Sequence, residues 1–114
     1  MKPQKHSINP YNGARIASFR EHTPDETRKI MNRAARSFQL WRRKPLNERS
    51  ALLLRAAGVL ESRKEALARC ITEEMGKPLK ESLAEIEKCS WVCRYYSEKA
   101  KDFLKDLLNV SPLN

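Results

Sequence analysis

After the first 22 residues, apolar positions recur every three or four residues, the spacing that places side chains on one face of a helix. The first 22 residues differ, because Asn-Pro and Asn-Gly pairs, which favour turns, separate short apolar pieces there. We therefore expect residues 1–22 to form an N-terminal arm or short β-hairpin, with Ile8 on one side of the turn and Ile16 and Phe19 on the other.

The first predicted helix begins at Thr23 and ends before Pro45. Thr23 can cap the helix, Pro24 suits its first position, and Glu26 completes a capping box. The apolar positions of this helix are Ile30, Met31, Ala34, Ala35, Phe38 and Trp41.

The second predicted helix runs from Asn47 to about Ser62 and is unusually apolar. Its clearest polar line consists of Glu48, Arg55 and Ser62, spaced by seven. A helix with so narrow a polar stripe is normally covered on more than one side. A small bundle of short helices offers too little cover for it.

A third helix is predicted to open with a capping box at Ser62–Glu65 and to end at Gly76, where a left-handed residue satisfies its last carbonyls. Its expected buried residues are Leu67, Cys70, Ile71 and Met75, with an ion pair between Glu65 and Arg69 on the wet side. Pro78 cannot continue a helix but begins one well, so Gly-Lys-Pro joins two helices at a sharp angle.

The fourth predicted helix is long, from Pro78 to about Leu108, with an ion pair between Arg94 and Glu98. Its expected inner face comprises Leu83, Ile86, Val92, Cys93, Tyr96, Ala100, Phe103, Leu104 and Leu107. The predicted fold class is mainly α, with about four helices over residues 23–108 and a short hairpin before them. Residues 109–114 form an atypical tail.

The chain has 114 residues, which suits one domain, and a formal net charge of +9. This excess is expected to be a solvated, Lys/Arg-rich helical surface, and no nucleic-acid partner is expected. Were nucleic acid to bind, the best candidate residues are Arg42, Arg43, Lys44 and Arg49 around a turn. The first residues are basic but lack the apolar stretch of a secretory signal, and no apolar run approaches the ~20 residues of a membrane span. With an odd number of cysteines as well, we expect a cytoplasmic protein with free thiols.

Few residues suggest chemistry. Cys89 and Cys93 lie one helical turn apart, but a zinc site needs about four ligands and only His6 and His22 could add to them. Buried free thiols are the expected role of these cysteines. The acids Glu73, Glu74, Glu81, Glu85 and Glu87 are expected to be surface carboxylates, and Trp41, Trp91, Tyr95 and Tyr96 to be core aromatics.

Three stretches, in order, resemble the N-terminal segment of the NAD(P)-dependent aldehyde dehydrogenase family over about residues 8–106. The first, NPYNGARIASF, is similar to the family's opening hairpin. The second carries Ala34, Phe38, Trp41, Glu48, Arg49, Leu53, Ala57 and Leu60 in the family's Ala-x-x-x-Phe-x-x-Trp, Glu-Arg and Leu-x-x-x-Ala-x-x-Leu pattern. The third carries Glu74, Gly76, Lys77, Pro78 and Glu81 in its Glu-x-Gly-Lys-Pro-x-x-Glu block. EMGKP together with KCSWVCRYYSEKA most resembles the succinate-semialdehyde dehydrogenase branch.

The resemblance implies an α/β fold with a Rossmann-type cofactor domain, around whose sheet these helices pack, and homo-oligomeric assembly. It also implies NAD(P)+-dependent oxidation of an aldehyde to a carboxylic acid. In the family a cysteine attacks the aldehyde, hydride passes to the cofactor, and a Glu-activated water hydrolyses the thioester.

None of that apparatus transfers to residues of this chain. Its only glycines are Gly13, Gly58 and Gly76, so the cofactor-binding glycine turn is absent, as are the nucleophile and base motifs. We therefore predict no catalytic, cofactor-binding or metal residue here, no bound NAD or NADP, and no activity of this shortened chain alone. A small basic helical module that binds nucleic acid, and a helical interaction protein that covers a partner with its second helix, stay open as alternatives.

Overall fold

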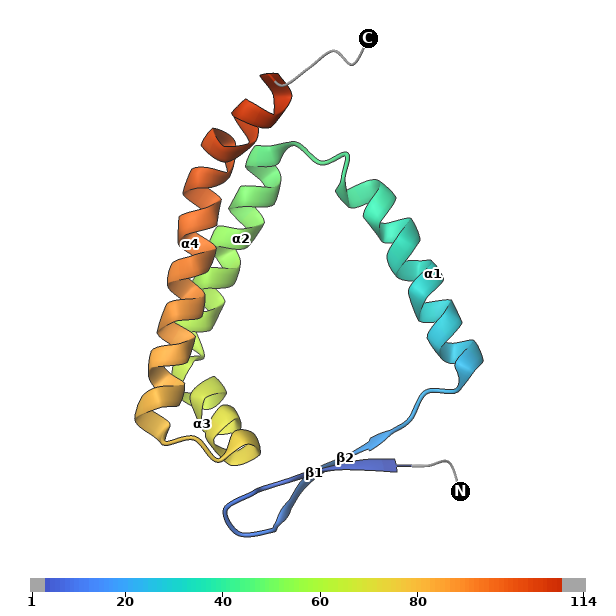
Figure 1. Ribbon diagram of the computed structural model, residues 1–114, viewed down its shortest axis with the longest axis vertical. Coiled ribbons are helices and arrows are strands. Elements are labelled where there is room, and N and C mark those ends of the chain that lie inside the picture. The colour runs from blue at the N-terminus through green and yellow to red at the C-terminus, as the bar shows by residue number, and fades with distance from the viewer. Residues whose placement is uncertain (1–3, 110–114) are drawn as a thin grey trace.

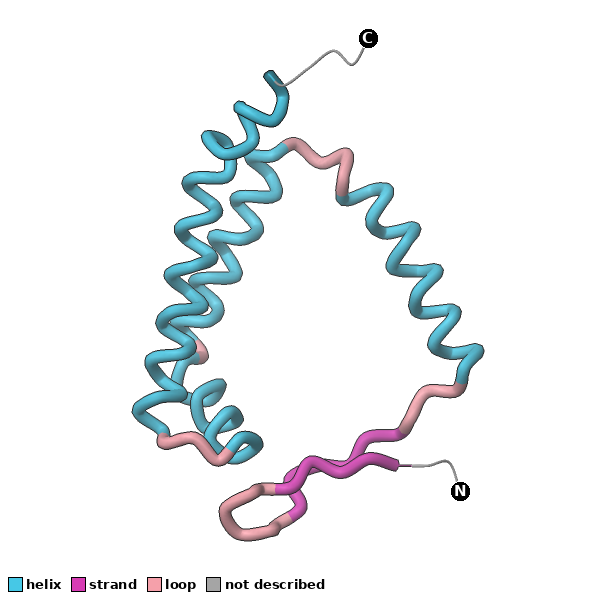
Figure 2. Tube along the Cα trace, in the orientation of Figure 1, coloured by secondary structure: helices cyan, strands magenta, loops and turns pink. Residues whose placement is uncertain are grey.

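The computed structural model describes residues 4–109, and the side chains of residues 4–105. Its elements are β1 (Gln4–Ile8), β2 (Arg15–Arg20), α1 (Pro24–Trp41), α2 (Leu46–Ser62), α3 (Lys64–Met75) and α4 (Leu79–Asn109). The predicted class, four helices after a two-stranded hairpin, is confirmed (Figure 2). Most of the expected atypical tail, residues 110–114, lies outside the described residues.

The hairpin is antiparallel, with Lys5 opposite Phe19 and His6 opposite Ser18. The Asn9 amide donates to the Ala14 carbonyl across the turn, at 2.8 Å. The side-chain oxygen of Asn9 also accepts from the backbone of Tyr11, which shows why asparagine suits this turn.

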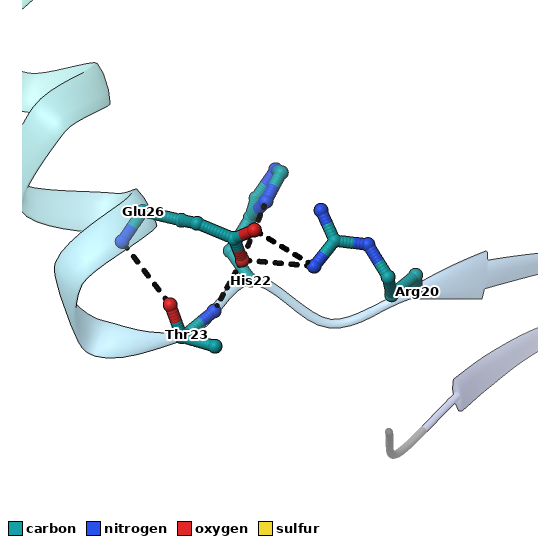
Figure 3. Close-up of polar contacts among 4 residues, drawn as sticks. All are labelled: Arg20, His22, Thr23 and Glu26. Atoms are coloured by element: carbon teal, nitrogen blue, oxygen red, sulfur yellow. Dashed lines mark hydrogen bonds and ion pairs between the residues drawn. The ribbon is translucent and has the colours of Figure 1, made fainter. Parts of the chain in front are cut away.

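The start of α1 joins the hairpin through one carboxylate. Thr23 and Glu26 form the predicted capping box, in which the Thr23 hydroxyl accepts from the Glu26 amide and the Glu26 carboxylate accepts from the Thr23 amide. The same carboxylate accepts two hydrogen bonds from Arg20, at 2.9 and 3.0 Å (Figure 3). These bonds raise the pKa of Arg20. The carboxylate also lies 3.9 Å from Nδ1 of His22. The polar contacts therefore fix where α1 begins.

The three later helices form the packed part of the molecule. α2 and α3 both pack against α4. The buried apolar residues of the three helices are Ala57 in α2, Ala68 in α3 and Ile86 in α4. In contrast, α1 contributes no buried residue. Figure 1 shows α1 standing apart from the α2–α4 pair, joined to it by a loop at one end and through the hairpin at the other.

The open shape has a measurable consequence. The radius of gyration is 19.5 Å, whereas a compact domain of about 100 residues has one of about 13 Å. The chain exposes 9698 Å² of surface, and a folded monomer of its mass exposes about 6,400 Å². Much apolar surface therefore stays in water when this chain is alone.

The break between α3 and α4 follows the prediction. Gly76 adopts the left-handed conformation, with φ of 71°, and its amide donates to the Thr72 carbonyl. α4 begins at Leu79, one residue after the predicted start, and the Pro78 carbonyl accepts from Ser82. The hydroxyls of Thr72 and Ser82 lie 2.9 Å apart and link the two helices across the turn.

Several local predictions are wrong. Ser62 does not cap α3, because its hydroxyl donates to the Val59 carbonyl while Arg63 occupies the cap position. The expected pairing of Arg94 with Glu98 is replaced by a bond to Glu61, 33 residues away. No Glu65–Arg69 pair forms among the described residues.

The expected inner faces of α3 and α4 are also only partly covered. Met75 is 69% exposed and Cys70 is exposed, whereas Leu67 and Ile71 are half-buried. On α4, burial holds as far as Cys93, but Tyr96, Phe103 and Leu104 are exposed. The Leu107 side chain lies outside the described residues. These faces are apolar as predicted, but the described part of the chain covers them only in part.

Candidate functional site

The two turn motifs of the sequence meet in space. A Cβ atom on Gly76 would lie 2.9 Å from Cγ of Pro10, so the proline ring of the hairpin sits directly against the turn between α3 and α4. Beside it, Ser7 donates to the carboxylate of Glu74 at 2.9 Å. Gly76 is therefore required twice, by its positive φ and by the approach of Pro10. The Asn-Pro and Glu-x-Gly-Lys-Pro motifs form one structural corner.

A second polar cluster ties α2 to α4. Glu61 accepts hydrogen bonds from Arg94 at 2.6 and 3.0 Å and from Ser90 at 2.6 Å. The bonds from Arg94 and Ser90 lower the pKa of Glu61 to about 2, and the bond to Glu61 raises the pKa of Arg94. A carboxylate held this firmly ionised is a poor proton acceptor at neutral pH, so the cluster is an interhelical clamp rather than an acid–base pair. The sequence offers no signal for a pair 33 residues apart.

The cysteines do not form a metal site. Cys89 and Cys93 share one face of α4, but Cys70 and Cys89 are exposed and Cys93 is half-buried, so the prediction of buried thiols is wrong. Within residues 4–109 the structure contains no group of three His, Cys, Asp or Glu side chains placed to hold a metal ion. His6 lies instead on the hairpin, 2.9 Å from Ser18.

The acidic candidates lie on the surface, as predicted, and several are paired with lysines. Lys77 bonds to Glu85, and Lys64 bonds to Glu87 at 2.6 Å; each bond raises the pKa of the lysine. All five candidate acids are exposed. Carboxylates so placed contribute to solubility and helix pairing.

The expected core aromatics are largely exposed. Trp91 is 61% exposed and stacks on Tyr95 with ring centroids 5.3 Å apart, and Tyr95 meets Tyr96 edge to face. The row of aromatic contacts continues along α4 to Phe103, whose ring centroid lies 6.4 Å from that of Tyr96. The basic turn is engaged locally, since Arg42 lies over the Phe38 ring and Lys44 bonds to Glu48.

An apolar concavity lies between α2 and α4, and Trp41, the last residue of α1, is among the residues that line it. It measures about 470 Å³ and is lined by Trp41, Leu46, Arg49, Ser50, Leu52, Leu53, Ala56, Tyr96, Ala100 and Leu104. We call it the Arg49 groove. Nε of Arg49 is buried and has no hydrogen-bond partner among the described residues. The sequence places Arg49 only in the basic turn and in the Glu-Arg pair, and no pattern in it signals that the side chain is enclosed.

The glycines of this chain do not lie in a dinucleotide-binding turn. A cofactor turn needs glycines where a strand passes into a helix, so that backbone amides reach the phosphates. The two positive-φ glycines are instead in the hairpin turn, Gly13, and at the end of α3, where Pro10 occupies the space over Gly76. No catalytic step can be assigned to the described residues of this chain.

Comparison with known protein families gives one match over nearly the whole chain. A model of the aldehyde dehydrogenase family matches residues 2–112, so the chain belongs to that family. Among the described residues, no helix combines the length and hydrophobicity required to cross a bilayer.

Curated proteins similar to this chain include succinate-semialdehyde dehydrogenases. The chain is 37% identical over 100 residues to a probable succinate-semialdehyde dehydrogenase (NADP+) of Synechocystis sp., covering 88% of this chain and 22% of that protein. It is 33% identical over 99 residues to a succinate-semialdehyde dehydrogenase (NADP+) of Deinococcus radiodurans, covering 87% and 21%. The chain therefore spans about a fifth of the length of the curated relatives it matches.

A solved structure shows the same arrangement. The succinic semialdehyde dehydrogenase of Streptococcus pyogenes, in complex with NADP+, superposes with a TM-score of 0.81 at 30% identity. The superposition covers 87% of this chain and 22% of that one. The open arrangement of hairpin, α1 and packed helices is therefore similar to the matched part of that dehydrogenase.

Proposed function

We propose that this chain forms the N-terminal part of an NAD(P)-dependent aldehyde dehydrogenase that oxidises succinate semialdehyde to the carboxylic acid. The relatives in Synechocystis and Deinococcus, both named for this substrate and for NADP+, support the assignment. Within that enzyme the described residues serve as a wrapping layer, because their apolar faces need cover and they hold no catalytic constellation.

The observation that carries the proposal is the bare apolar surface of α2. Only Ala57 of this helix is buried, while Leu54 is 43% and Val59 is 52% exposed. A helix that is apolar on several sides is stable in water only when a further layer covers it. The missing layer corresponds to the four fifths of the relatives' length that this chain does not span.

A graft tests this function. The aligned 100 residues of the Synechocystis relative are replaced by the corresponding residues of this chain, and NADP+ reduction with succinate semialdehyde is measured. We expect turnover within about tenfold of the parent enzyme, because the replaced layer supplies no reacting group. Deleting the aligned residues is the control and should abolish activity. A soluble, oligomeric graft without activity would contradict the proposal.

The chain alone is proposed to bind neither NAD nor NADP and to turn over no aldehyde. Purified chain, succinate semialdehyde and each cofactor, followed at the absorbance of the reduced nicotinamide, test this directly. Reduction above the protein-free rate would refute it.

The proposal extends to the cellular setting. We place the whole enzyme in the cytoplasm as a homo-oligomer, since three free thiols suit a reducing compartment and at least two of them are exposed. Light scattering of the grafted enzyme tests the assembly, and fractionation of the source cells tests the location.

A further inference from the structure

We propose that the Arg49 groove receives a segment of the same dehydrogenase polypeptide that carries an aspartate or glutamate among apolar side chains, with the carboxylate accepting from Nε of Arg49. The inference rests on the proposed function, because the segment belongs to the part of the enzyme that this chain does not span.

The walls of the groove define most of the ligand. Leucines and an alanine of α2 face Tyr96, Ala100 and Leu104 of α4, and Trp41 also lines the groove. A groove with such walls, about 470 Å³ in volume, favours aliphatic or aromatic side chains over water. Nucleic acid does not fit these walls, because burying phosphates against hydrocarbon without enough donors is unfavourable.

Arg49 supplies the polar requirement. The neighbouring Ser50 carbonyl already accepts a hydrogen bond from the hydroxyl of Ser97 at 2.8 Å. Nε of Arg49 is enclosed yet bonds to nothing described, and a buried donor on a cation is unfavourable until it is paired. The acceptor that matches a guanidinium in planarity and charge is a carboxylate, which can bond to Nε and a terminal nitrogen together.

The charge of the chain favours the same occupant. With a net charge of +9, a segment bearing a negative group is attracted to this surface, whereas a second copy of the chain is repelled. The relatives are about five times as long as the matched residues, so polypeptide of the required kind is available within one subunit.

The test compares the effect of Arg49→Met on stability in the isolated chain and in the grafted dehydrogenase. Arg49→Met keeps the aliphatic stem and removes the donor. In the isolated chain, where Nε has no partner within the described range, we expect the urea midpoint for loss of helical signal to stay unchanged or to rise. In the grafted dehydrogenase, we expect the unfolding constant to increase about tenfold to a hundredfold, the range for a lost hydrogen bond to a charged group.

Arg55→Met is the matched control, since Arg55 is an exposed arginine of the same helix; it should change both proteins little and alike. Destabilisation of the isolated chain by Arg49→Met would show that the chain already satisfies Arg49, and no effect in an active graft would show that no acid pairs with it. Either result overturns the inference. An inactive graft would instead contradict the proposed function, while the isolated-chain measurement still tests the pairing.

A photo-crosslinking side chain at Leu53 identifies the occupant in the graft. We expect a single crosslinked peptide from the same subunit, containing an aspartate or glutamate between apolar residues. A crosslink to a second subunit, or to copurified nucleic acid, would contradict the assignment.

Discussion

The packed helices α2–α4 and the helix α1, which stands apart from them, have very different surroundings. The former share buried residues, the Glu61–Arg94 clamp and the Thr72–Ser82 bond. The latter has a well-formed N-terminal cap but no buried residue. An isolated helix of 18 residues is only marginally stable in water. The contrast teaches that capping fixes where a helix begins, while tertiary cover decides whether it persists.

The largest expected effect comes from filling the tightest contact of the packed region. Ala57 is fully buried where α2 meets α4, so Ala57→Leu should destabilise the chain by about 3 kcal/mol, the upper end for overpacking. The matched change Ala35→Leu, on exposed α1, should alter stability by about 0.5 kcal/mol or less. Urea titration followed by circular dichroism measures both. Equal effects would remove the distinction between the two regions.

The second-largest effect on stability is expected at the corner where Gly76 meets Pro10. Gly76→Ala must adopt a positive φ, at a cost of about 1–2 kcal/mol, and must also displace the Pro10 ring. Gly13→Ala provides the control, because Gly13 has the same φ of 71° with nothing within 4 Å of the added Cβ. The difference in unfolding free energy between the two variants measures the Pro10 contact. If the two losses were equal, the corner would contribute nothing beyond backbone conformation.

The cap of α1 is expected to act locally. Thr23→Ala removes the acceptor for the Glu26 amide and should cost the helix about 1 kcal/mol. Helical signal assigned to α1 should fall while the unfolding midpoint of α2–α4 stays constant. Thr27→Ala, at an exposed position of the same helix, should instead raise helix content slightly. A shift in the α2–α4 midpoint by Thr23→Ala would show that α1 is coupled to the packed helices.

The smallest effect concerns pH. Because the folded pKa of Glu61, about 2, lies below its ordinary value of 4.5, its contribution to stability is complete above about pH 4.5 and is lost as pH falls toward 2. Glu61→Gln should therefore flatten the decline of stability over this interval. Arg94→Met should flatten it similarly, and the double variant should add little more. An unchanged slope in Glu61→Gln would contradict the clamp.

Local chemistry was predictable from the sequence. The Thr23 capping box, the left-handed Gly76 and the hairpin turn depend on contacts within a few residues, so the pattern was enough. The capping box predicted at Ser62 was wrong despite the same pattern, because the Ser62 hydroxyl donates to the Val59 carbonyl within α2.

Long-range features were not predictable. The partner of Arg94 and the contact between Pro10 and Gly76 depend on how distant segments fold together. Met75 and Trp91 are exposed in the described part of the chain, and their apolar character alone could not reveal this. The Arg49 groove could not be predicted either, because only the folded chain shows that Nε of Arg49 is enclosed and has no acceptor in the described part.

Amide hydrogen exchange of α1, compared between the isolated chain and the grafted dehydrogenase, tests the central claim most directly. The account predicts that α1 amides exchange almost as fast as in an unfolded chain when the protein is alone, while those of α2 and α4 are protected. In the graft, α1 should gain protection comparable to α4. Strong protection of α1 in the isolated chain, or none in an active graft, would contradict the view that these helices are built to be covered by the rest of an aldehyde dehydrogenase.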